Sequence, residues 1–223
     1  MMNLQFDFTL AITNYNKAQF IDRAIRSCLM QLVFRRNIEI IVVDDASTDN
    51  SLGIIQEFSK DLRLFVNESN RGVAYASNLA LTHAQGHYWM RVDADDFLNM
   101  YACAFMANVL DENDDIDFVY CDHYRVDVHG VKVSKVRLNN DEALYEHGAG
   151  VLFRTDVLRK IGGYDEGLRN CEDYDLLYRL KKGGHKGYYL PIPLYRYYIH
   201  GDNITLTTER EEFRKIVKAK HGI

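Results

Sequence analysis

Three aspartates lie within four residues, Asp93-Ala94-Asp95-Asp96, directly after the apolar run 87–92. Carboxylate oxygens are the hard ligands that Mg²⁺ and Mn²⁺ prefer, and a cation held by them also binds phosphate oxygens. Such a cluster can also be a solvated loop that caps the next helix. Because this one follows a predicted strand, at the edge where parallel sheets bind ligands, we favour a metal site.

Polar side chains also follow the other three strands that apolar runs predict in the first half of the chain. One such residue alone is usually a turn residue or a helix cap. The carboxyl ends of parallel strands, however, lie at one edge of a sheet, so these groups are expected to converge. They are Thr13-Asn14-Tyr15-Asn16, Asp44-Asp45, and Asn67 with Asn70-Arg71-Gly72.

Predicted strands and helices alternate through the first half of the chain. This alternation implies right-handed crossovers and an α/β fold with a mostly parallel sheet that helices cover on both faces. The strands are predicted at 6–13, 38–43, 62–67 and 87–92, and the helices at 18–33, after Ser47-Thr48-Asp49, and at 73–84.

The second half of the chain predicts a mixed arrangement. A hairpin is expected in which His129-Gly130 forms a two-residue turn between strands 124–128 and 131–136. Glycine pairs stop two of the helices. The remaining predicted elements are strands near 117–120 and 188–199 and helices at 100–110, 155–160, 172–182 and 209–220.

Two glycine-rich signatures of nucleotide binding are absent from the sequence. No Gly-x-Gly-x-x-Gly follows the first predicted strand, and there is no P-loop motif. A nucleotide diphosphate would therefore need another counter-charge, which a cation on the aspartates would supply. The 27 Lys and Arg against 32 Asp and Glu give a net charge of −5, which argues against nucleic-acid binding.

The cysteines match no zinc spacing, so we expect reduced, buried thiols in a cytoplasmic protein. No signal-peptide pattern begins the sequence, and no apolar run approaches the roughly 20 residues of a membrane span. The predicted terminal helix is short, basic and amphipathic, which leaves peripheral contact with the inner membrane face as an alternative. The four cysteines are Cys28, Cys103, Cys121 and Cys171. The basic and apolar residues of the predicted terminal helix are Phe213, Arg214, Lys215, Ile216, Val217, Lys218 and Lys220.

Several motifs, in this order and spacing, resemble the family 2 glycosyltransferases from about Phe8 to His200. The resemblance implies the GT-A fold, with a mostly parallel central sheet, flanking helices, a Rossmann-like first half and a smaller mixed second half. It implies one domain over 1–223, binding a nucleotide-sugar within about 1–99 and an acceptor within about 100–223. The matching segments are Ile12–Asn16, Val43–Asp49, Asn70–Gly72, Ala76–Asn78, Gly86, Asp93–Asp96, Gly148–Gly150, Phe153-Arg154, Gly162–Glu166 and Glu172–Leu176.

The resemblance implies an activity as well as a fold. A sugar would pass from a nucleotide-diphospho-sugar, often a UDP-sugar, to a glycan or lipid-linked acceptor with inversion at the anomeric carbon. Mn²⁺ or Mg²⁺ would be the cofactor, and the product would belong to a surface polysaccharide or lipid-linked glycan.

The resemblance also implies roles for individual residues. Asp173 matches the general base, with Glu172 as the next candidate; inverting transfer needs one such group. An acid in the first turn of a helix also offsets the helix dipole, which is the alternative for Asp173. The donor residues would be Thr13, Tyr15, Asp45, Asp93 and Asp95, and the candidates for contact with the metal would be Asp93, Asp95, Asp96 and His200. Asn70 is a further candidate for contact with the uracil side or the phosphates of the donor, with a helix cap as the alternative.

Two other functions compete with this interpretation. One is a non-catalytic sugar-nucleotide-binding domain of the same fold, which the retained Asp95 and Asp173 disfavour. The other is a sugar-phosphate nucleotidyltransferase, whose glycine-rich loop after the first strand is missing here. In a transferase, we expect the loops 139–150 and 163–171 to select the acceptor.

Overall fold

The computed structural model describes residues 5–146, 148, 150–200 and 208–222. Its strands are β1 (Phe6–Asn14), β2 (Ile38–Asp44), β3 (Arg63–Val66), β4 (Gly86–Asp93), β5 (Phe97–Leu98), β6 (Phe118–Val126), β7 (Lys132–Val136), β8 (Val151–Arg154) and β9 (Gly187–Tyr198). Its helices are α1 (Ile21–Leu29), α2 (Ser51–Gln56), α3 (Val73–His83), α4 (Ala102–Glu112), α5 (Asp141–Glu146), α6 (Thr155–Lys160), α7 (Glu172–Lys182) and α8 (Thr208–His221).

The first half of the chain forms the parallel part of the sheet. β1 pairs in parallel with β2 and with β4, and β2 pairs in parallel with β3. Thr13 pairs with Asp93, and Asn14 with Asp44, so the carboxyl ends of three strands lie side by side. The predicted alternation of strands and helices is confirmed.

β8 connects this half to the rest of the sheet. It pairs antiparallel with both β4 and β6, and β6 pairs in parallel with β9. The strand order is β3-β2-β1-β4-β8-β6-β9-β5, with β7 on β6. Since only β5, β7 and β8 run against the other strands, the sheet is mostly parallel, as expected of the GT-A fold.

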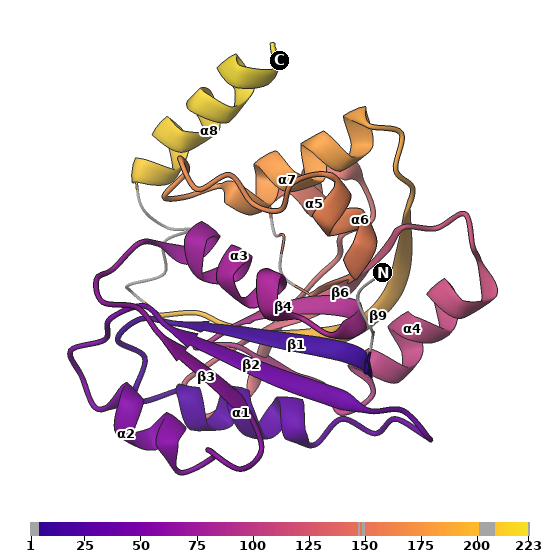
Figure 1. Cartoon of the computed structure of the whole chain (residues 1–223). Helices are drawn as coiled ribbons and strands as arrows, with labels where there is room; N and C mark the ends of the chain where they lie inside the picture. Colours follow the sequence, from indigo (N-terminus) through magenta and orange to yellow (C-terminus); the bar gives the residue numbers. More distant parts are fainter. Residues whose placement is uncertain (1–4, 147, 149, 201–207, 223) are drawn as a thin grey trace.

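Apolar side chains of the sheet form cores on both of its faces. Phe8, Leu10 and Ile12 of β1 pack with α1 and α4 on one face. Ala11 and Trp89 belong to the core of the other face, with α3, α6 and α7. Figure 1 shows these two layers, with α1 and α2 below the sheet and α3, α6 and α7 above it. The central strands are therefore apolar on both sides.

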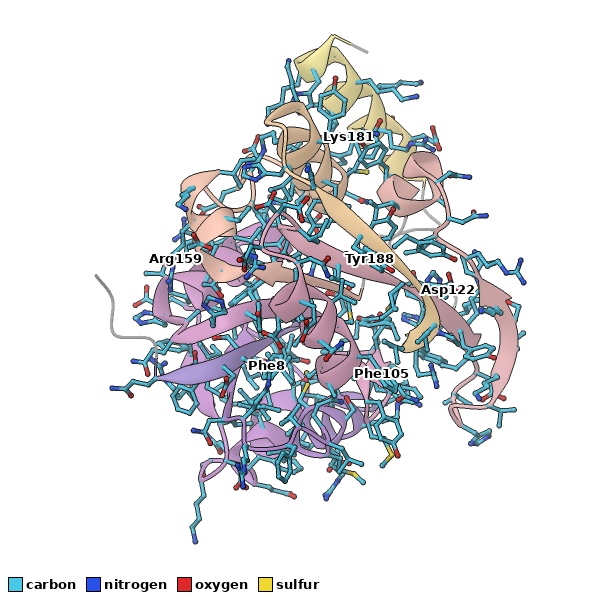
Figure 2. All side chains as sticks on the ribbon, turned by 90° about the vertical axis from the view of Figure 1, so that its right-hand side faces the viewer. Phe8, Phe105, Asp122, Arg159, Lys181 and Tyr188 are labelled. Carbon is cyan, nitrogen blue, oxygen red and sulfur yellow. The ribbon has the colours of Figure 1, made fainter. Side chains whose placement is uncertain are left out.

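Helix α8 packs against α7, and Val217 of α8 is fully buried there. Asp175 of α7 is also fully buried, and its carboxylate accepts hydrogen bonds from Arg179 and Lys220 at 2.7 Å and lies 2.8 Å from His221 Nε2. Burial opposes the charge, but hydrogen bonds from Lys220, Arg179 and His221 outweigh it and lower the pKa of Asp175. Figure 2 shows α8 in yellow beside Lys181 of α7. In the part of the chain that the structure describes, no helix is long and apolar enough to span a bilayer.

The predicted helix 18–33 is shorter in the structure, where α1 ends at Leu29. Gln31 Nε2 donates to the Ser27 carbonyl at 2.9 Å, and the Leu32 amide donates to the Met100 carbonyl at 2.8 Å. These bonds take the chain away from the helix and tie it to the segment before α4.

The predicted hairpin is confirmed, but its two-residue turn is wrong. The Asp127 carboxylate accepts the amides of His129 at 3.0 Å and Val131 at 2.9 Å, which stabilises a longer loop between β6 and β7. The strands predicted near 117–120 and at 124–128 are one continuous strand, β6. The elements β5, β8 and α5 were not predicted, because each has six residues or fewer and shows no clear periodicity.

Candidate functional site

A cleft of about 560 Å³ opens at the carboxyl edge of the parallel strands. The ends of β1, β2 and β4 form one wall, and residue 148 with the start of α7 forms another. Eight of the ten predicted site residues line the cleft, namely Thr13, Tyr15, Asp45, Asn70, Asp93, Asp95, Glu172 and Asp173. Four cationic side chains also line it, those of Lys17, Arg91, Arg169 and Arg210. The expected convergence of polar groups at this edge is confirmed.

Asp45 organises the loop that follows β3. Its carboxylate accepts hydrogen bonds from Asn67 Nδ2 and the Gly72 amide at 2.7 Å, and from the Arg71 amide at 2.9 Å. These bonds fix the turn that presents Asn70 to the cleft. Tyr15 stands at the rim with 44% of its surface exposed, where its ring is free to stack against a ligand.

Asp95 is the acidic residue of the cleft that is most closely surrounded by cationic or imidazole groups. Its Oδ2 lies 2.7 Å from Lys17 Nζ and 3.0 Å from His200 Nε2. Burial opposes the charge of Asp95, but Lys17 and the hydrogen bond from His200 more than offset it and lower its pKa. Asp95 is therefore a carboxylate at neutral pH, the form that binds a cation.

Arg91 connects the two walls of the cleft and is not among the predicted site residues. Its Nε lies 3.1 Å from Asp93 Oδ1 at the end of β4, and its Nη1 donates to Glu172 Oε1 of α7 at 2.7 Å. Burial raises the pKa of Glu172. The charge of Arg91 lowers this pKa and that of Asp173 raises it, and the net change is upward. The available signal was an arginine inside an apolar strand, because a buried arginine needs anionic partners.

Asp173 lies in the first turn of α7, and backbone amides hold its carboxylate. Oδ2 accepts the Gly148 amide at 3.1 Å, and Oδ1 accepts the Tyr174 amide at 2.8 Å. The approach of Gly148 is so close that a Cβ at that position would lie 2.4 Å from Asp173 Cβ. The segment 148–150 is part of the family resemblance, and the structure shows that the backbone at residue 148 approaches Asp173.

The two remaining predicted residues, Asp96 and His200, are not among the residues that line the cleft. Asp96 is 1% exposed, and its Oδ1 accepts the Tyr198 amide of β9 at 2.8 Å. Burial, together with the charges of Asp95 and Asp93, raises the pKa of Asp96 well above its usual value. His200 reaches the site through Asp95, as described above.

The acidic residues suit a divalent cation that a phosphate ligand helps to coordinate. Across the described residues, no three carboxylate, thiolate or imidazole side chains converge so as to hold a metal without a further ligand. Asp93 Oδ1 is buried and, although close to Arg91, accepts no hydrogen bond of good geometry. Mg²⁺ is commonly held by one or two carboxylates with water and phosphate oxygens. Asp93 and Asp95 fit this arrangement.

The chain belongs to glycosyl transferase family 2, whose family model matches residues 9–162. Chondroitin synthase of Escherichia coli is 27% identical over 221 residues, which cover 94% of this chain and 32% of that protein. The Staphylococcus aureus poly(ribitol-phosphate) beta-N-acetylglucosaminyltransferase TarS is 28% identical over 177 residues, 74% of this chain and 31% of TarS. The chain thus spans about a third of the length of these relatives.

Solved structures show the same fold at low sequence identity. The structure of S. aureus TarS 1–349 in complex with UDP-GlcNAc has a TM-score of 0.79 at 22% identity, covering 96% of this chain and 66% of that one. The mannosyltransferase PcManGT from Pyrobaculum calidifontis, in complex with GDP-Man and Mn²⁺, has a TM-score of 0.69 at 20% identity, covering 97% and 61%. The predicted GT-A fold is confirmed.

Proposed function

We propose that this chain is a metal-dependent inverting glycosyltransferase that transfers a sugar from a UDP-sugar to a glycan or lipid-linked acceptor. The observation that carries the proposal is the shared cleft, which Asp95 just after β4 and Asp173 at the start of α7 both line. The UDP-GlcNAc complex of TarS supports a uridine donor, and the Mn²⁺ complex of PcManGT supports a divalent metal. The similarity to chondroitin synthase supports a role in polysaccharide assembly.

The first 99 residues are proposed to bind the donor. Tyr15 offers an aromatic face for the base, and Thr13, Asp45 and Asn70 offer polar groups around it. Asp93 and Asp95 would hold Mn²⁺ or Mg²⁺, with Asp96 and His200 behind them. The bound cation supplies positive charge beside the diphosphate leaving group.

Residues from about 100 to 223 are proposed to bind the acceptor and to supply the base. Asp173 accepts the proton of the acceptor hydroxyl while the hydroxyl oxygen bonds to the anomeric carbon. The nucleoside diphosphate leaves from the opposite face, which inverts the configuration. Each Asp173 oxygen accepts one amide and keeps a further lone pair for this proton. Glu172 is tied to Arg91 and is 5% exposed, which supports Asp173 over Glu172 as the base.

Two variants test the proposal. With a panel of UDP-sugars, Mn²⁺ and oligosaccharide acceptors, we expect the wild type to release UDP and form product. Asp173→Asn should bind UDP normally but lose transfer, and Asp95→Asn should lose Mn²⁺-dependent UDP binding. Tight donor binding without turnover on any acceptor, unchanged in Asp173→Asn, would instead support a non-catalytic binding domain.

We also propose a cytoplasmic location with peripheral membrane contact through α8. Lys215, Ile216 and Lys218 are exposed on the second half of this helix, which places two cations beside an apolar side chain. Sedimentation with anionic phosphatidylglycerol vesicles tests the contact. Loss of binding in Lys215→Glu/Lys218→Glu would support it, and equal binding to neutral vesicles would contradict it.

A further inference from the structure

The ammonium group of Lys17 lies in a cation position beside Asp95. Lys17 Nζ is 2.7 Å from Asp95 Oδ2 and 3.4 Å from His200 Nε2, which itself lies 3.0 Å from the same Asp95 oxygen. The side chains of Lys17 and Asp95 are 25% and 14% exposed, and both line the cleft. The ion pair is thus partly shielded from water and faces the ligand space.

The backbone that carries Lys17 is held firmly. The Lys17 amide donates to Ser51 Oγ at 3.2 Å, and the Asn16 amide donates to Ser47 Oγ at 2.9 Å. Asn16 has a φ of 53°, and its Oδ1 accepts the Thr48 amide at 2.7 Å. Any movement of the ammonium group therefore comes from the four-carbon side chain, which is flexible in lysine.

We propose that Lys17 is the resident cation of Asp95 in the donor-free protein and a ligand of the diphosphate in the donor complex. The inference rests on the proposed function and adds a role for a residue outside the predicted site. An Asp95 oxygen that accepts an ammonium group at 2.7 Å has no room for a metal ion on the same side. A divalent cation can therefore bind Asp95 Oδ2 only when Lys17 moves away.

The diphosphate of the donor is an alternative anionic partner for the Lys17 ammonium group. A diphosphate in the cleft is a dianion or trianion that an ammonium group binds as a point charge. Lys17 then leaves Asp95, and the affinity of Asp95 for the divalent cation rises. Because such coupling is reciprocal, the bound cation also raises the affinity for the nucleotide diphosphate.

Mn²⁺ binding measured by electron paramagnetic resonance, with and without UDP, tests this role. Without UDP, Lys17→Met should bind Mn²⁺ about tenfold more tightly than the wild type, the order expected when a charge-assisted hydrogen bond no longer competes. Lys17→Arg keeps the charge and should stay close to the wild type. With saturating Mn²⁺, Lys17→Met should bind UDP about tenfold more weakly by calorimetry.

Lys160→Met is the matched control, because Lys160 pairs with Asp156 at the same 2.7 Å outside the cleft. It should leave both affinities unchanged, and circular dichroism should show that every variant is folded. If the UDP-loaded wild type binds Mn²⁺ but Lys17→Met shows an unchanged Mn²⁺ affinity, only the competition between Lys17 and Mn²⁺ for Asp95 is overturned. Unchanged UDP affinity overturns the diphosphate contact. Absence of Mn²⁺ binding in all proteins, even with UDP, overturns both the competition and the metal dependence of the proposed function.

Discussion

Replacing Arg91 by methionine is expected to destabilise the fold by removing the cation between the two walls of the cleft. The Arg91 side chain is 10% exposed and contacts Asp93 of β4 and Glu172 of α7. Methionine fills much of the same volume, so the main change is the loss of charge. Asp93 and Glu172 then both lose the cation that they share.

The burial of the two carboxylates sets the size of the effect. Removing one member of a buried ion pair costs roughly 3–5 kcal/mol. The Glu172 side chain is 6% exposed and falls in this class, whereas the Asp93 side chain is 32% exposed and is partly screened by water. We therefore expect a loss of about 3–4 kcal/mol in the free energy of unfolding, which for a chain of this size lowers the Tm by about 6–16 °C.

The loss should depend on pH in a defined direction. Burial already raises the pKa of Glu172, and Arg91 opposes that rise. Without Arg91, the pKa of Glu172 in the folded protein rises further. The folded state then loses stability as the pH rises above the pKa of an unfolded glutamate, about 4.3, because Glu172 ionises more readily in the unfolded chain. Below that pH the group is neutral in both states and needs no cation. The difference between Arg91→Met and the wild type should therefore be larger at pH 8 than at pH 5.

Thermal and urea unfolding followed by circular dichroism measure this difference. Arg26→Met is the matched control, because Arg26 pairs with Asp22 on the surface, with side chains 58% and 44% exposed, and should change little. Adding Glu172→Gln to Arg91→Met should recover part of the loss, since the buried charge is then absent. An Arg91→Met protein as stable as Arg26→Met at pH 8 would refute the reasoning.

Three further predictions concern Asp175 of α7, the contact between Gly148 and Asp173, and the thiols. Asp175→Asn should speed amide hydrogen exchange in α8. In the wild type, the folded-state pKa of Asp175 is lowered, so protection of the α8 amides from exchange should fall as the pH drops below about 4. Unchanged exchange would contradict this. Gly148→Ala should lower kcat at least tenfold because the added methyl group displaces Asp173, and the affinity for UDP should stay unchanged. A normal kcat would show that the backbone at residue 148 moves away from Asp173 without loss of activity. Burial raises the pKa of Cys28 to about 12 and that of Cys171 to about 11, so a thiol reagent at pH 8 should react only after unfolding; rapid reaction of the native protein would contradict it.

The parallel part of the fold was predictable because its signals are local. Each strand there is an apolar run, and a helix follows each of β1, β2 and β3. The rule that parallel strands end at one edge then placed Asp45, Asp93 and Asp95 together without knowledge of the strand order. Their separation along the chain did not matter, since every strand delivers its last residues to the same edge.

The other wall of the cleft was less predictable because its contacts are distant in sequence. Arg91 and Glu172 are 81 positions apart, and they meet because β8, a strand of four residues, pairs with both β4 and β6. So short a strand has no recognisable alternation. The position of Asp96 also depends on a distant contact: Ala94 and Asp95 line the cleft, but the Asp96 carboxylate accepts a hydrogen bond from the Tyr198 amide of β9.

The partners of the carboxylates divide the cleft into fixed and exchangeable parts. Backbone amides hold Asp45 and Asp173, so these two keep their positions without a counter-charge that a ligand must displace. Arg91 holds Asp93 from within the core, where the guanidinium cannot leave without exposing a second buried acid. Asp95 alone among these four relies on the flexible cation of Lys17, on the ligand side. Exchange of one cation for another should therefore begin at Asp95, while Asp173 keeps its position.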